Sequence, residues 1–192
     1  MTGNGISIKG IYHDVLMDPE KGVIYDSGWR SNTIVRRCRV LIAGFMKNDS
    51  PSGIQYLAVG QGKSEWDGQW STANPPGPAL DTVTGLESQA IDGPITIQPS
   101  VPVPGKEYLQ IQYLDDTDNP VSDENVRTSR LEVKATLKPG YPVPTEFNTY
   151  PLREFGLFGS FAGQPFMINC VRHPVIYKDL SATLIREIKL YF

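Results

Sequence analysis

Glycine and proline interrupt this sequence throughout, and they limit how long any regular element can be. The chain has 18 glycines and 16 prolines among its 192 residues. Proline lacks the N–H that a helix interior or a central strand needs, and glycine weakens both kinds of element. Frequent interruption therefore favours many short strands joined by turns over a few long helices. Hydrophobic residues make up 40% of the chain, which is enough to form a core.

Several segments alternate apolar and polar residues, as strands with one buried face do. In one of them Val15–Met17 and Val23–Tyr25 flank a turn with Pro19 and Gly22, which predicts a hairpin. We predict a mainly β fold, a β-sandwich-like single domain over residues 1–192 with about eight to nine strands. The further predicted strands are Ile54–Val59, Tyr108–Leu114, Arg130–Leu137, Leu152–Phe158, Pro165–Ile176 and Ala182–Phe192.

One segment has the periodicity of a helix. Ser31 or Asn32 can cap its first turn through a side-chain oxygen, and Pro51 lies beyond its end. Apolar residues at three- and four-residue spacing make a single stripe, so we predict one long α-helix. The stripe consists of Ile34, Val35, Cys38, Leu41, Ile42 and Phe45.

Arg36, Arg37 and Arg39 lie off this apolar stripe. They are either a docking site for an acidic partner or a solvated helix face, and the solvated face is the commoner case. We keep the three arginines as candidate partner contacts.

Residues 63–106 differ from the rest of the chain, because they contain Pro75-Pro76-Gly77-Pro78 and four further prolines. We predict a loop-rich, Pro/Gly-rich insertion, and long loops of this kind are usually functional or packed on a partner. Trp66 and Trp70 lie in it. Exposed aromatic side chains suit a protein–protein interface or a platform on which sugars stack, and we prefer the interface.

Charge and hydropathy exclude several classes of protein. The formal net charge is −3, so the chain lacks the basic excess that nucleic-acid binding requires. No apolar run is long enough to span a membrane, and the first residues do not have the pattern of a secretory signal. We expect Cys38 and Cys170 to be reduced core residues of a protein made in a cytoplasm.

The chain offers little catalytic chemistry. Gly60–Ser64 resembles the end of a phosphate-binding loop, but Leu57 replaces the first glycine and no helix is predicted to follow. Cys170 and His173 are three residues apart on a strand and therefore point to opposite faces. The acidic turn Asp115–Asp118 lacks the glycine and glutamate of a calcium loop. We expect no enzyme, and we assign no catalytic residue, metal or cofactor.

Three motifs in a fixed order resemble a known class of proteins. The predicted helix leads into a strand that ends Val59-Gly60-Gln61-Gly62, Glu154–Phe158 forms a later strand, and an apolar strand, Leu184–Phe192, closes the sequence. This set resembles tail, fibre-attachment or baseplate-proximal structural proteins of tailed phages and related contractile injection systems. Gly156 in the second motif also has a physical meaning, because it allows another backbone to approach closely.

The resemblance implies a structural subunit of a phage virion tail, at the baseplate, neck or tail-fibre joint, or of a phage-derived injection machine. Such a subunit would be assembled in the bacterial host cytoplasm, would dock to other virion proteins and would form a ring-shaped homo-oligomer. The candidate partner contacts are Arg36, Arg37, Arg39, Trp66 and Trp70.

Two alternatives remain open. A carbohydrate- or receptor-binding β-sandwich module, contacting a host receptor or glycan, predicts that Trp66 and Trp70 line an exposed shallow groove. A hydrolase predicts a pocket in which His13 or His173 lies within hydrogen-bond reach of a Ser, a Cys or a carboxylate.

Overall fold

The computed structural model of the chain describes residues 8–49, 51–71, 74–123, 125–145 and 147–192. It is built mainly from β-strands, and the predicted mainly β class is confirmed. The elements in chain order are β1 (Lys9–Asp18), β2 (Gly22–Asp26), β3 (Arg30–Ile34), α1 (Cys38–Lys47), β4 (Ser52–Gly60), η1 (Ser64–Gln69), η2 (Leu80–Thr82), β5 (Ile95–Thr96), β6 (Gln110–Tyr113), β7 (Arg130–Leu137), β8 (Thr149–Phe161), β9 (Gln164–Met167), β10 (Asn169–Asp179) and β11 (Thr183–Tyr191).

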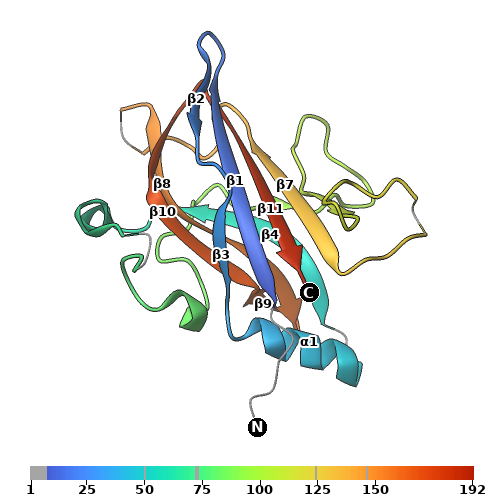
Figure 1. Cartoon of the computed structure of the whole chain (residues 1–192). Coiled ribbons are helices and arrows are strands. Elements are labelled where there is room, and N and C mark those ends of the chain that lie inside the picture. Colours follow the sequence, from blue (N-terminus) through green and yellow to red (C-terminus); the bar gives the residue numbers. More distant parts are fainter. Residues whose placement is uncertain (1–7, 50, 72–73, 124, 146) are drawn as a thin grey trace.

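Within the described residues the strands form one curled antiparallel sheet. Its order is β5-β4-β8-β10-β3-β1-β11-β7-β6, with β2 added to β1 and β9 to β8. Figure 1 shows the curl: β1 and β11 lie in front, and β4 passes behind them. An isolated parallel bridge between Ile97 and Leu109 brings the two ends of the sheet together. The expected sandwich of two packed sheets is not confirmed, because a single sheet curls around its own core.

One hydrophobic core fills the inside of this curl. Burial alternates along β11, so that Leu184, Ile188 and Leu190 point inward and are almost fully buried. They share the core with Leu57 of β4 and Phe155 of β8, which come from the other side of the curl. The apolar alternation that predicts these strands therefore corresponds to the inward face of one continuous core.

Strand β8, which lies between β4 and β10, is buried on both faces from Tyr150 to Gly159. A second, smaller cluster covers the outer face and includes Ala58, Phe158 and Cys170. The outer face is covered because the loop after β4 folds back over it. Cys38 and Cys170 are both free and buried, as expected.

The helix is shorter than predicted. It begins at Cys38 and ends at Lys47, and the left-handed backbone of the next residue, Asn48, stops it. Ser31 and Asn32, predicted as caps, instead belong to β3, and Asn32 pairs with Gly10 of β1. The β-branched residues that follow suit a strand as well as a helix, so pairing with β1 and β10 decides the local structure.

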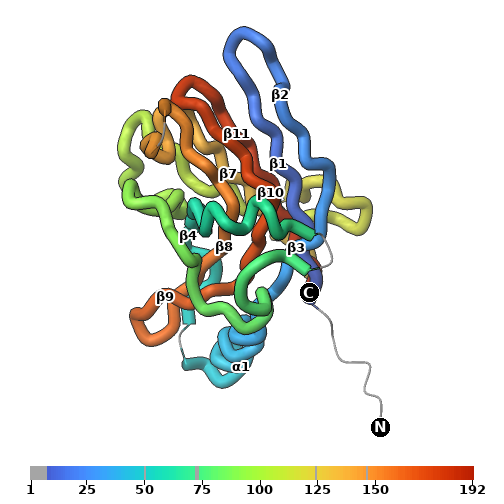
Figure 2. The backbone as a smooth tube through the Cα atoms, turned by 90° about the vertical axis from the view of Figure 1, so that its left-hand side faces the viewer, coloured from blue at the N-terminus to red at the C-terminus, as the bar shows by residue number. Residues whose placement is uncertain are grey.

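The predicted loop-rich insertion over residues 63–106 is not confirmed. These residues contain η1, η2 and β5 between irregular stretches, and they pack on the sheet along much of their length. Ala90 and Ile95 from this segment lie in the main core. Figure 2 shows this chain segment running along the sheet from the end of β4.

Candidate binding cleft and its anchored loop

Buried charged side chains on β8 and β10 hold residues 61–71 and 74–90, which we call the anchored loop. Arg153 is 5% exposed, and its Nε and Nη2 donate to the two carboxylate oxygens of Asp67, each at 2.7 Å. Its Nη1 donates to the carbonyl of Gln61 at 3.1 Å. The paired hydrogen bonds hold the pKa of Asp67 below its usual range. Arg153 therefore fixes both the start of the loop and η1.

Arg172 of β10 holds the middle of the anchored loop. Its Nη1 donates to the carbonyls of Pro76 and Pro78, at 2.8 and 2.6 Å, and its guanidinium lies 4.8 Å from the centre of the Trp66 ring. Gly77 sits against the same guanidinium, where a Cβ would approach Nη1 to 2.9 Å. The proline-rich turn is therefore shaped around one buried arginine.

Glu154 of β8 holds the end of the anchored loop. Its Oε1 accepts the backbone N–H of Ser88 at 2.8 Å, and two residues later the N–H of Ala90 bonds the carbonyl of Val59. Burial raises the pKa of the Glu154 carboxyl, while the N–H donors of Ser88 and Glu87 act in the opposite direction. Three charged residues in neighbouring strands thus hold the loop, in addition to the apolar contacts that Leu80, Val83 and Leu86 make with the outer face of the sheet.

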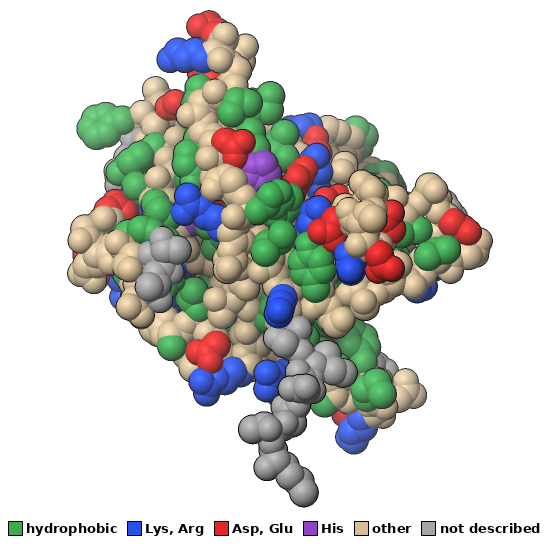
Figure 3. Space-filling view, viewed as in Figure 1, with side chains coloured by type: hydrophobic (Ala, Val, Ile, Leu, Met, Phe, Trp, Pro, Cys, Tyr) green, Lys and Arg blue, Asp and Glu red, His purple; other side chains and the backbone are tan. Residues whose placement is uncertain are grey.

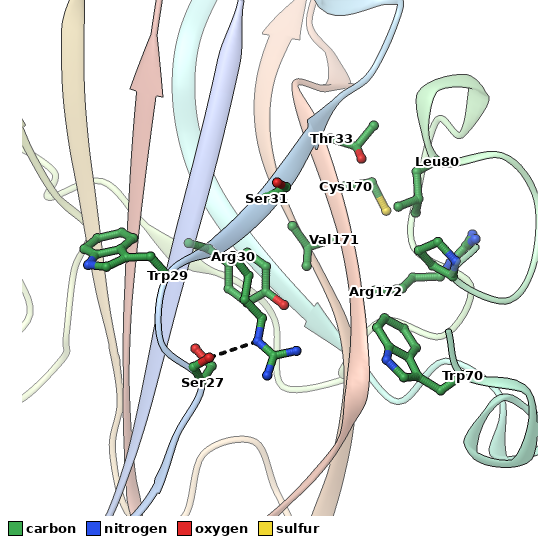
Figure 4. A pocket seen from close by; sticks show the side chains of 12 residues that line it. Ser27, Trp29, Arg30, Ser31, Thr33, Trp70, Leu80, Cys170, Val171 and Arg172 are labelled. Carbon is green, nitrogen blue, oxygen red and sulfur yellow. Dashed lines mark hydrogen bonds between the residues drawn. The ribbon is translucent and has the colours of Figure 1, made fainter. Parts of the chain in front are cut away.

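A cleft of about 620 Å³ lies between β3, β10 and the anchored loop. β3 and β10 pair at two positions, Ile34 with Asn169 and Thr33 with Cys170. The rest of β3 pairs with β1, and the rest of β10 pairs with β8, which leaves space between the two strands. Figure 4 shows this space, with the side chain of Arg30 lying in it.

The lining of the cleft is cationic and aromatic. It includes the guanidinium groups of Arg30 and Arg172, and none of the described lining residues is acidic. Trp29 and Trp70 lie on opposite sides of the cleft (Figure 4). Trp29 is 45% exposed and lies close to the ammonium group of Lys189. These groups suit a ligand that has both negative charge and a flat face.

A buried polar cluster inside the curl does not open into this cleft. Arg186 donates from Nε and Nη2 to the two oxygens of Asp14, at 2.6 and 2.7 Å, and from Nη2 to Nε2 of His173 at 3.2 Å. Its guanidinium packs 3.7 Å from the centre of the Phe155 ring. Burial lowers the pKa of His173 to about 4, so the imidazole is neutral near pH 7. The contacts of Arg186 in this cluster are therefore ion pairing, hydrogen bonding and packing against other buried residues of the chain.

The two histidines have different surroundings. His13 lies near the surface, where its Nε2 is 2.7 Å from Oδ1 of Asp26, and its ring packs on Trp29. That contact supplies the carboxylate that the hydrolase alternative requires, but no hydroxyl or thiol is bonded to either histidine in the described part of the chain. Burial raises the pKa of the Cys170 thiol to about 12, which disfavours the nucleophilic thiolate.

The three arginines predicted as partner contacts lie together on the outside of the molecule. There they contact other residues of the same chain. Arg36 forms an exposed ion pair with Asp81, with its Nε 2.6 Å from Oδ2. The guanidinium of Arg37 lies over the Phe166 ring at 4.4 Å. Arg39 lines a small hollow that Asp81 shares. Two of the three arginines therefore have intramolecular partners.

The predicted tryptophan pair is separated. Trp66 is 5% exposed and lies under Arg172, whereas Trp70 is half-buried and lines the cleft. The aromatic side chain across from Trp70 is Trp29, which sequence reasoning missed, together with Arg30. The signal available in the sequence is that Trp29 and Arg30 directly follow the turn Asp26-Ser27-Gly28, where exposed side chains are common.

Comparison of the chain with protein-family models, with curated proteins and with solved structures found no match. In the described residues, no group of three or more His, Cys, Asp and Glu side chains is arranged to hold a metal ion. Across the same residues, no helix has the length and apolar character needed to cross a membrane.

Proposed function

We propose that this protein is a structural subunit of a phage virion tail, at the baseplate, neck or tail-fibre joint, or of a phage-derived injection machine. It acts by docking to other virion proteins and to further copies of itself in a ring. The sequence motifs described above suggest this role, and one surface supports it.

That surface surrounds α1 and the end of β11. An apolar groove of about 250 Å³ lies between α1, β4, β6 and the C-terminal end of β11. At and beside its rim, Phe45 is 49%, Met46 86% and Phe192 44% exposed. Figure 3 shows hydrophobic side chains gathered at this lower end of the molecule. Large apolar side chains grouped in this way are costly to leave in water and are typical of protein interfaces.

The rest of the architecture suits a docking protein. The anchored loop is held by buried arginines, and the β1–β2 hairpin projects from the body with Met17, Val23 and Ile24 exposed (Figure 1). Rigid, exposed features lose little conformational entropy when a neighbouring subunit binds them.

Light scattering of the purified protein across a range of concentrations tests self-assembly, and sedimentation of host lysate with antibody detection tests incorporation into particles. We expect an oligomer, or co-sedimentation with tail-sized particles. The double variant Phe45→Ser/Met46→Ser should reduce both without changing the circular dichroism spectrum.

Val101→Ser/Val103→Ser is the matched control, because both residues are exposed and lie away from α1, on the segment before β6. A protein that stays monomeric at every concentration and remains in the light lysate fractions would contradict the proposal. Equal loss of assembly in both double variants would contradict the role of the α1 surface.

A further inference from the structure

We propose that the cleft between β3 and β10 binds an acidic saccharide, with Arg30 contacting its carboxylate and Trp70 stacking against a sugar ring. This site lies apart from the apolar surface around α1, and the inference does not depend on the assembly role.

Arg30 is positioned to bind an anion. Its Nε donates to the carbonyl of Ser27 at 2.9 Å, which fixes the plane of the guanidinium, and the group lies in the cleft (Figure 4). Among the described residues, no carboxylate forms an ion pair with Arg30. The two terminal nitrogens of a fixed guanidinium match the spacing of the two oxygens of a carboxylate.

The aromatic part of the cleft is attached to an anchored element. Trp70 directly follows η1, which Arg153 holds through Asp67, and Pro75 also lines the cleft. A half-buried indole presents a flat apolar face, on which the C–H groups of a sugar ring can pack. The hydroxyls of Ser31 and Thr33 both donate and accept hydrogen bonds, as sugar hydroxyls do.

Charge favours a small acidic sugar over other anions. The formal net charge of the protein is −3, so a polyanion such as nucleic acid would be repelled by the molecule as a whole. Within the cleft, however, the charged groups are guanidinium groups. A saccharide with one or a few carboxylates is attracted by these guanidinium groups, and its ring can also pack on the indole of Trp70.

Titration calorimetry with trigalacturonate and with its methyl ester isolates the role of the carboxylate, because the two differ in charge but keep the same rings. A second matched pair is 3′-sialyllactose and lactose. We expect the acid of at least one pair to bind at least tenfold more tightly than its neutral counterpart, and this preference should shrink as salt is added.

Arg30→Gln should remove the preference for the acid. Trp70→Ala should weaken binding of the acid and of its neutral counterpart, whereas Trp70→Phe, which keeps a ring, should retain part of it. Lys21→Gln, on the distant hairpin turn, removes the same charge as Arg30→Gln and should leave binding unchanged.

Equal binding of acid and neutral forms would overturn the proposal, as would an unchanged preference in Arg30→Gln. Failure of all four saccharides to bind at millimolar concentration would also overturn it. A dinucleotide that competes as well as the acidic saccharides would show that the cleft selects for anions and not for sugars.

Discussion

His173 lies inside the curled sheet as a neutral imidazole. Its Nδ1 is 2.8 Å from the carbonyl of Pro174, which can only accept, so Nδ1 carries the proton and Nε2 is free to accept from Arg186. Arg186 in turn pairs with Asp14, and all three side chains are buried. Protonation would place a second cation beside Arg186 and remove the acceptor that it uses.

We expect this histidine to make the protein sensitive to acid. Burial, and then the charge of Arg186, lower the pKa of His173 from 6.5 to about 4. The unfolded chain therefore takes up a proton below pH 6.5 that the folded chain refuses until about pH 4, so stability falls as the pH falls through this window. Complete titration corresponds to about 3 kcal/mol.

Chemical denaturation at several pH values between 7 and 4 measures this loss. In His173→Gln, whose amide oxygen can take the place of Nε2, the fall in stability over this window should be smaller. His13→Gln, which removes the histidine near the surface, is the control and should keep the fall of the parent protein. Identical pH dependence in the parent and in His173→Gln would rule out this role.

At the scale of elements, strand β8 combines two features of the sequence: a glycine at a close backbone contact and charged residues that hold the anchored loop. Gly156 in mid-strand is predicted to let another backbone approach, and the carbonyl oxygen of Asn169 lies 2.8 Å from where its Cβ would be. That close approach is confirmed. Arg153 and Glu154 of the same strand hold the anchored loop, so β8 contributes both to the core and to the anchoring of the loop.

Gly156→Ala should destabilise the protein by about 1 to 3 kcal/mol, because the new methyl group meets a backbone carbonyl that cannot move independently of β10. Gly53→Ala is the matched control: no atom lies within 4 Å of its Cβ position. Urea unfolding of the two variants gives the comparison. Equal stability in both would show that β8 and β10 can separate at low cost.

Arg172→Met should release the middle of the anchored loop. The carbonyls of Pro76 and Pro78 lose their donor, at a cost of about 3 kcal/mol, as for other buried charged hydrogen bonds. Limited proteolysis and hydrogen exchange should detect faster opening of the anchored loop. Arg36→Met breaks an exposed ion pair to Asp81 and should change stability by less than about 1 kcal/mol. Similar protection in the two variants would contradict the anchoring role.

At the scale of the whole molecule, the curl of the sheet places strands from both ends of the chain around one core. Residues of β1 and β11 pair over their full length, so the first and last strands lie side by side. The anchored loop contributes Ala90 to the same core. The sheet, its core and the loop should therefore unfold together.

Trp29 and Trp70 line the cleft, and Trp66 lies in the anchored loop against Arg172, so tryptophan fluorescence reports on that region. Circular dichroism reports on the sheet. We expect the two signals to give the same denaturation midpoint in the parent protein. A fluorescence transition at clearly lower denaturant concentration would show that the loop opens before the sheet unfolds.

Local patterning specified the hairpin, most of the strands and the close approach at Gly156, because alternation and turn chemistry act over a few residues. The predicted start of the helix was wrong. Residues 31–34 suit either a helix or a strand, and only their pairing with β1 and β10 decides between the two. Tertiary structure decided the curling into one sheet, the burial of Trp66 under Arg172 and the placement of Arg30 and Trp70 along one cleft. Each of these depends on residues that are far apart in the chain, and the period of the sequence does not encode which distant strands become neighbours.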